Sequence, residues 1–360
     1  MSVFADAASL LAGERVPADR DEAARAMLAA LQGEDPQHLF ALLRVAQAMP
    51  RLFELASPLA PGLVCIGGSV AGPVGGEGAS MDVSGKGLDF RSAWTSCIGE
   101  AIECLSLERV GLAAGGAGCA AGPTREAAIL SGLLELVERD AAALWWIGGR
   151  RPRLLPAEQL TAAGAEGLLS ALRQGASARQ TWFLDLTTDL EIPCVAALSV
   201  NRTGTGLAVG LAARPTVPEA LKAALLELCQ MELAGVLAGH KEHEGGPEAL
   251  SDADRRHLRL ASVRAAEHPI LVGAGFSQEI LCRVPPDSAE QLAWMSERLA
   301  AHGVAYRVRD LTVASIGVPC LRVEAPGLQS LDARLETERL AGFLAISGGN
   351  PLYTQGTELI

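Results

Sequence analysis

Residues 124–146 read TREAAILSGLLELVERDAAALWW, a run that is apolar around almost its whole circumference if it is helical. Glu135, Glu138 and Arg139 interrupt this run at positions i, i+3 and i+4, so their side chains share one stripe. A helix that is apolar nearly all round is buried, and a buried charge is tolerated only when it is paired or bound to a metal. The stretch therefore predicts a core helix that carries a charged site.

Two further predicted helices place polar residues in the same way. Ser96, Glu100 and Glu103 share one stripe of the first, and Glu227 and Gln230 share a stripe of the second. If the three stripes face one cavity, carboxylates of like charge raise each other's pKa, and a hard cation such as Mg²⁺ relieves this by taking oxygen ligands. The pattern predicts a Mg²⁺–nucleotide site. The alternative is three separate solvated faces or intrahelical Glu–Arg pairs.

The composition limits the class of protein. The chain has 360 residues, 49% hydrophobic and 20% charged, with a net charge of −12. This acidic balance argues against a nucleic-acid or anionic-membrane partner, since either favours a basic surface. No run reaches the roughly 20 apolar residues of a membrane span, and the N-terminus lacks a signal peptide, so we expect a cytoplasmic protein. The eight cysteines contain no CxxC pair and are expected to be buried thiols.

The hydrophobic periodicity predicts an α/β (α+β) protein. The N-terminal part is expected to be helical at 19–31 and 38–59, with a break or kink at Pro50. Further helices are expected at 92–107, 124–146, 218–238, 254–265 and 288–302. Strands are expected at 63–66, 110–122 (strand or loop), 181–186, 193–200, 207–212, 279–284, 306–311 and 319–324, and a charged loop at 240–247.

A weak internal repeat suggests two related units. An Asp-Leu-Thr run begins at Asp185 and again at Asp310, and a Pro-Cys pair follows each, at 193–194 and at 319–320. Each copy predicts strand, short loop, strand, so two similar α/β units packed on one sheet are expected, with chance as the alternative.

No complete phosphate-binding loop is present, because the Gly85-Lys86 pair lacks the other residues of a Walker sequence. Lys86 is nevertheless expected in a glycine-flanked loop, from which its ammonium group could reach a phosphate as a point charge. The HxxH spacing at 240–243 is assigned to a solvated loop. Cys104 and Cys119 are assigned to core packing rather than to catalysis.

Several blocks of this sequence resemble the YcaO superfamily, and they occur in that family's order between about residues 62 and 328. The blocks are SGKG at 84–87, SCIGEAIE at 96–103, ELVERDA at 135–141 followed by Trp145-Trp146, Asp185-Leu-Thr followed by Ile192-Pro193, and ELCQ at 227–230.

The resemblance implies a YcaO-like fold, with mixed sheets and helices that enclose an ATP site and with two similar α/β subunits in one domain. Residues 1–60 would form an N-terminal helical segment and residues 61–360 the catalytic domain. The cofactors implied are ATP and Mg²⁺. The residues expected to bind the nucleotide and its metal ions are Lys86, Ser96, Glu100, Glu103, Glu135, Glu138, Arg139, Glu227 and Gln230. Of these, Glu100, Glu103, Glu135, Glu138 and Glu227 are the expected metal ligands, and Glu138 and Arg139 the expected catalytic residues.

The activity implied by the resemblance is ATP-dependent activation of a backbone amide in a ribosomally synthesised precursor peptide. A Cys, Ser or Thr side chain, or external sulfide, adds to the peptide carbonyl, and the resulting oxygen attacks the γ-phosphate of ATP. An internal thiol or hydroxyl then gives a thiazoline or oxazoline, whereas sulfide gives a thioamide. The protein's task is positioning and charge neutralisation.

Two departures from the family pattern leave alternatives open. The chain ends NPLYTQGTELI rather than in a PxPxP tail, which leaves room for thioamide formation with a sulfur-delivery partner. No leader-binding module fits within residues 1–60, so we expect a separate partner, either an E1-like or leader-binding protein or a TfuA-like protein, and a homodimer of this chain. The remaining alternative is a non-catalytic YcaO-like subunit that binds peptide or acts as a scaffold.

Overall fold

The computed structural model describes residues 3–71, 80–112, 117–176, 179–278, 285, 287–332 and 334–359. The chain divides into unit 1 (Met1–Ala56, Leu63–Gly132, Arg307–Glu324) and unit 2 (Ser57–Gly62, Leu133–Tyr306, Ala325–Ile360). The predicted α/β class is confirmed, and the paired strands of the described chain are all antiparallel. Over these same residues, no helix combines the length and the apolar character needed to cross a membrane.

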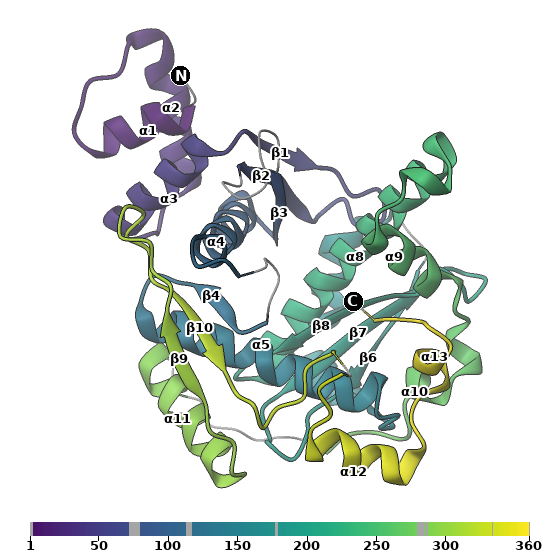
Figure 1. The fold of residues 1–360 in the computed structure, drawn as a ribbon. Helices are drawn as coiled ribbons and strands as arrows, with labels where there is room; N and C mark the ends of the chain where they lie inside the picture. The colour runs from purple at the N-terminus through teal and green to yellow at the C-terminus, as the bar shows by residue number, and fades with distance from the viewer. Residues whose placement is uncertain are drawn as a thin grey trace. The chain divides into compact units, whose positions relative to one another are not determined.

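Unit 1 consists of helices and two three-stranded sheets, ordered β1-β2-β3 and β4-β10-β9 (Figure 1). Its helices are α1 (Val3–Leu11), α2 (Ala18–Ala30), α3 (Pro36–Ala48), α4 (Phe90–Arg109) and the start of α5 (Arg125–Trp146). Its strands are β1 (Arg51–Leu55), β2 (Val64–Ala71), β3 (Ser80–Gly87), β4 (Cys119–Ala121), β9 (Arg307–Asp310) and β10 (Cys320–Glu324).

Helix α4 lies at the centre of the core of unit 1. Asp89 caps its N-terminus by accepting a hydrogen bond from the Ser92 amide. Its apolar face is fully buried at Trp94, Cys97 and Ile98, and this cluster also contains buried residues of α1, α2, α3, β2 and β3. The spacing of three and four residues between apolar positions therefore directs one face of α4 into the core, as the sequence predicted.

Unit 2 is built on one four-stranded sheet, ordered β5-β6-β7-β8. The strands are β5 (Arg153–Leu154), β6 (Gln180–Asp185), β7 (Cys194–Val200) and β8 (Ala208–Ala213). The helices are the remainder of α5, then α6 (Ala157–Ala162), α7 (Ala165–Arg173), α8 (Val217–Gly245), η1 (Pro247–Ala249), α9 (Asp252–Ser262), η2 (Ala265–Glu267), α10 (Pro269–Val272), α11 (Ser288–Ala301), α12 (Glu338–Ser347) and α13 (Pro351–Thr354).

Small residues let α8 pack closely on this sheet (Figure 1). A Cβ atom at Gly210 of β8 would overlap the backbone of Ala224 and Leu228 on α8. Elsewhere in unit 2, the adjacent Trp145 and Trp146 are almost fully buried, and their indole N–H groups donate to the carbonyls of Ile270 and Thr357. The two tryptophans therefore serve core packing.

Three local predictions were wrong. The helix expected at 38–59 ends at Ala48, because Pro50 forces Met49 into an extended conformation, so the expected break at Pro50 is confirmed. The helix expected beyond Pro50 is wrong, since β1 follows there. The charged segment expected as a loop at 240–247 mostly continues α8 to Gly245, since it contains no helix breaker before Gly246, where φ is +74°. Lys86 lies in strand β3 rather than in a loop. The strand expected at 279–284 falls outside the described residues.

The internal repeat is present as two hairpins with the same side-chain hydrogen bonds. Asp185 accepts from the Thr187 amide, and the Thr187 hydroxyl accepts from the Cys194 amide. The second copy repeats this with Asp310, Thr312 and Cys320 in the same roles. The expectation that both copies share one sheet was wrong, because β6–β7 and β9–β10 belong to different sheets.

Candidate functional site

The contact between β3 and α4 explains why the SGKG segment contains two glycines. A Cβ atom at Gly85 would overlap the backbone of Ala93 and Cys97, and one at Gly87 would meet Ser92 and Ala93. Only glycine permits this approach. The two glycines therefore let β3, the strand that contains Lys86, lie against the helix that carries the SxxxExxE residues.

Glu100 is held against that strand. Its carboxylate accepts a hydrogen bond from the Ser84 amide at 2.8 Å. Burial raises the pKa of Glu100, while the Ser84 N–H and the ammonium group of Lys86 act in the opposite direction. Lys86 and Glu100, two of the candidate residues, are therefore close neighbours within unit 1.

Glu103 lies one turn further along α4 and contacts the other sheet of unit 1. Its Oε1 accepts a hydrogen bond from the Ala121 amide of β4 at 2.9 Å. Ser96, one turn before Glu100, is exposed. Glu100 and Glu103 thus each fasten a strand to α4 through one carboxylate oxygen, so both have a structural role in addition to any ligand role.

The candidate residues of α5 lie in unit 2. Arg139 Nη2 donates to Glu135 Oε1 at 3.4 Å, and the two side chains are 24% and 32% exposed. The intrahelical Glu–Arg pair weighed from the sequence is therefore present. An ion pair of this kind contributes about 0.3–0.5 kcal/mol to stability, which is too little to prevent Arg139 from binding a phosphate instead. Glu138 is also half-buried.

Glu227 and Gln230 occupy adjacent positions on one stripe of α8 and are both half-buried. With Glu100, Glu103, Glu135 and Glu138, the candidate acids are neither in the apolar core nor fully in water. The sequence predicted buried charges on the stripe of α5, and the structure gives partial burial. This intermediate exposure suits groups that meet a polar ligand, because the desolvation penalty of a fully buried carboxylate is avoided.

Three thiols lie beside these acids, and burial together with the carboxylates raises the pKa of each. Burial and then Glu100 raise the pKa of Cys97 to about 12, and burial together with Glu100 and Glu103 raises that of Cys104 to about 11. In unit 2, burial and then Glu138 raise the pKa of Cys194. All seven described cysteines are buried and free, as predicted.

One buried ion pair of unit 2 was not predicted from the sequence. Asp140, next to Arg139 on α5, is fully buried and forms an ion pair with Arg339 of α12, which also binds Asp189. Asp140 additionally accepts from the Gln329 amide. The sequence signal was an aspartate within an apolar run, but its arginine partner lies 199 positions away and no periodicity connects them.

The donor set fits Mg²⁺ held together with a nucleotide. Among the residues that the structure describes, no three His, Cys, Asp or Glu side chains form a metal cluster by themselves. Mg²⁺ is usually bound by one or two carboxylates, with phosphate oxygens and water completing its octahedron. Carboxylate oxygens are the ligands that Mg²⁺ prefers, and the candidate glutamates supply them.

These features define an α/β protein whose partly buried carboxylates are suited to Mg²⁺ and phosphate. The model of the YcaO cyclodehydratase family, described as ATP- and Mg²⁺-binding, matches residues 111–329, and the chain belongs to this family. ATP and Mg²⁺ are the cofactors of the family. No curated protein matches the chain in sequence.

Solved structures support the fold assignment. A heterocyclase in complex with substrate and cofactor superposes with a TM-score of 0.67 at 22% identity, over 84% of this chain and 54% of that one. YcaO from Methanopyrus kandleri, bound with AMPPCP and Mg²⁺, gives 0.60 at 19% identity, over 82% and 92%. The heterocyclase TruD gives 0.50 at 27% identity, over 66% and 33%. The chain therefore has a YcaO-like fold and spans about half the length of the first heterocyclase.

Proposed function

We propose that this protein uses ATP and Mg²⁺ to activate backbone amides of a ribosomally synthesised precursor peptide and forms thiazoline or oxazoline rings. The observation that carries the proposal is the family match over residues 111–329, which include the ELVERDA and ELCQ blocks. Similarity to TruD, a heterocyclase, favours ring formation over thioamide formation. A separate leader-binding protein would present the peptide.

Each candidate residue has a role in this proposal. Glu100, Glu103, Glu135, Glu138 and Glu227 supply oxygen ligands for Mg²⁺, and Lys86, Ser96 and Gln230 contact the nucleotide. ATP supplies the electrophilic phosphorus that converts the amide oxygen into a leaving group. Arg139 stabilises the charge that develops on the transferred phosphate, since its pair with Glu135 is long and partly exposed.

Calorimetric titration of ATP, with and without Mg²⁺, tests the nucleotide site. We expect Mg²⁺-dependent binding with a Kd below about 100 μM. Glu138→Gln and Glu135→Gln should each abolish binding and leave the circular-dichroism spectrum unchanged, because the amide keeps the shape but loses the charge. Glu158→Gln on the exposed face of α6 is the matched control and should bind like wild type. Unfolding of both site variants would mean that these acids are structural.

Mass spectrometry then identifies the reaction. A Cys- and Ser-containing precursor peptide incubated with the protein, ATP and Mg²⁺ should lose the mass of one water for each ring formed. Exchange of one oxygen for sulfur, in the presence of sulfide, would establish the thioamide reaction instead. ATP binding without any change in peptide mass, even with a leader-binding partner present, would contradict both reactions and favour a non-catalytic subunit.

A further inference from the structure

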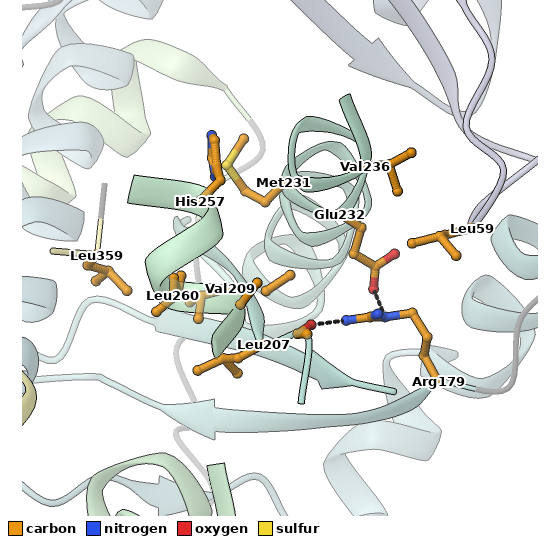
Figure 2. A pocket seen from close by; sticks show the side chains of 14 residues that line it. Leu59, Arg179, Leu207, Val209, Met231, Glu232, Val236, His257, Leu260 and Leu359 are labelled. Atoms are coloured by element: carbon orange, nitrogen blue, oxygen red, sulfur yellow. Dashed lines mark hydrogen bonds and ion pairs between the residues drawn. The ribbon is translucent and has the colours of Figure 1, made fainter. Parts of the chain in front are cut away.

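A pocket of about 190 Å³ lies in unit 2, between α8, α9 and β8 (Figure 2). It contains none of the candidate nucleotide residues. Figure 2 shows Glu232 and Arg179 on one side of the pocket and His257 of α9 on the other. An engineered cavity of about 150 Å³ is large enough to bind benzene, so this pocket has room for a ligand of similar size.

The charged side of the pocket holds two guanidinium groups for one carboxylate. Glu232, whose side chain is fully buried, accepts hydrogen bonds from Arg173, from the Ser199 hydroxyl and, at 2.9 Å, from Arg179 Nε. The side chains of Arg173 and Arg179 are only 8% and 9% exposed. This cluster therefore carries an excess positive charge at the pocket wall.

Arg179 is the member that lines the pocket. Its Nη2 donates to the carbonyls of Ser199 and Gly206, and its Nη1 donates to no acceptor among the described residues. Burial lowers the pKa of Arg179, and Arg173 adds to this effect while Glu232 opposes it. A buried cation with incomplete compensation is stabilised by an anion brought beside it.

The remaining walls are mainly aliphatic. Leu207, Val209, Val236 and Leu260 line the pocket, together with Met231. Burial lowers the pKa of His257, which disfavours a charged imidazole on the opposite side of the pocket. The pocket thus combines one cationic end with an apolar interior, which is complementary to a ligand with an anionic head and a short hydrocarbon tail.

We propose that this pocket binds a small branched aliphatic carboxylate, with Arg179 contacting the carboxylate and the aliphatic side chains of β8, α8 and α9 enclosing the hydrocarbon. The proposal does not rest on the nucleotide site. It assigns to this family member a second, anion-selective binding site within unit 2.

Calorimetric titration of the full chain with 4-methylpentanoate, without nucleotide, tests the pocket. We expect the carboxylate to bind at least tenfold more tightly than its neutral isostere 4-methylpentanamide, because only the anion compensates Arg179. Acetate should also bind at least tenfold more weakly, since it leaves the aliphatic walls uncovered. Equal affinity for the acid and the amide would overturn the assignment of Arg179. Equal affinity for acetate would show that the pocket binds anions without recognising the hydrocarbon, which would also overturn the proposal.

Two glycines of α8 provide a matched pair of variants. Gly235 lines the pocket and Gly239 does not, and a Cβ atom at either position would meet no atom within 4 Å. Gly235→Leu should fill the pocket and abolish 4-methylpentanoate binding, whereas Gly239→Leu should leave it unchanged. Both replacements favour the helix, so both variants should fold. Unchanged binding by Gly235→Leu, or no binding by the wild-type chain, would overturn the proposal.

Discussion

Glu100 is a partly buried acid with a structural contact of its own. Burial raises the pKa of Glu100, so the charged form of this side chain is less favourable in the folded chain than in water. The same carboxylate fastens β3 to α4 through the Ser84 amide. The proposed ligand role of Glu100 and its structural role can be separated by removing the charge alone.

We expect Glu100→Gln to weaken Mg²⁺-dependent ATP binding at least tenfold without lowering the free energy of unfolding. The amide oxygen still accepts from Ser84, and the half-buried charge is gone. Urea unfolding without Mg²⁺ and calorimetric ATP titration measure the two effects. Loss of stability by more than about 1 kcal/mol with unchanged ATP binding would show that Glu100 is only a structural clamp.

At the scale of single elements, the close contact between β3 and α4 depends on glycine. Gly85→Ala should lower the free energy of unfolding by several kcal/mol, because its Cβ would overlap the backbone of Ala93 and Cys97. Gly99→Ala, on α4 itself, is the control. Its Cβ would meet no atom within 4 Å, so it should stabilise the helix by about 1 kcal/mol. Chemical denaturation distinguishes the two, and a tolerated Gly85→Ala would contradict the close packing described.

Helix α9 begins with a reciprocal cap whose strength depends on pH. Ser251 and Asp254 form a capping box, and Lys241 also donates to Asp254. Although burial opposes the shift, hydrogen bonds from Ser251 and Lys241 lower the pKa of Asp254 to about 2. Because this folded-state pKa lies below the unfolded one, the stabilisation is present above about pH 4 and is lost as the pH falls towards 2.

Asp254→Asn should therefore destabilise the protein by about 1 kcal/mol at pH 7. The difference from wild type should shrink between pH 4 and pH 2. Thermal unfolding followed across this range measures the effect. Asp252→Asn, an exposed first-turn acid of the same helix, is the control and should change stability much less. A difference independent of pH would show that Asp254 acts by shape rather than by charge.

Local sequence signals predicted the longer helices and most strands, whereas the shorter helices α6, α7, α12 and α13 were not predicted. Helix α4 and helix α9 follow from apolar spacing. The C-terminal part of α8 was missed, because charged residues at 240–244 resemble a loop when a helix has one solvated face. Strand β1 was missed because the helical periodicity before Pro50 was carried beyond it. Both errors arise where a local pattern fits two conformations and tertiary contacts decide between them.

At the scale of the whole chain, the sequence predicted the repeated Asp-Leu-Thr hairpin but not its pairing. The hairpin is local, so its hydrogen bonds follow from residues within ten positions. The partner of β10 on its other edge is β4, about 200 residues earlier, and no periodicity specifies such a pairing. The candidate acids could be proposed from the sequence for the same reason that α4 and α5 could be predicted, because their spacing is local. The strand residues that donate hydrogen bonds to Glu100 and Glu103 were not predicted.

Arg339 provides the sharpest test of these long-range contacts in unit 2, because it binds two aspartates in different environments. The side chain of Asp140 is fully buried, whereas that of Asp189 is 53% exposed. Asp140→Asn should lower the free energy of unfolding by about 3 kcal/mol, since it removes one partner of a buried ion pair. Asp189→Asn removes a partner of the same arginine at the surface and should cost less than about 1 kcal/mol.

Urea denaturation at neutral pH gives both values. The comparison is matched because each variant keeps the size of the side chain and one oxygen acceptor, and each leaves Arg339 with its other aspartate. Equal effects of the two substitutions would mean that Arg339 is solvated in solution and does not tie α12 to α5. A large effect of Asp140→Asn alone would show that burial, rather than the number of ion pairs, determines how strongly this arginine stabilises the fold.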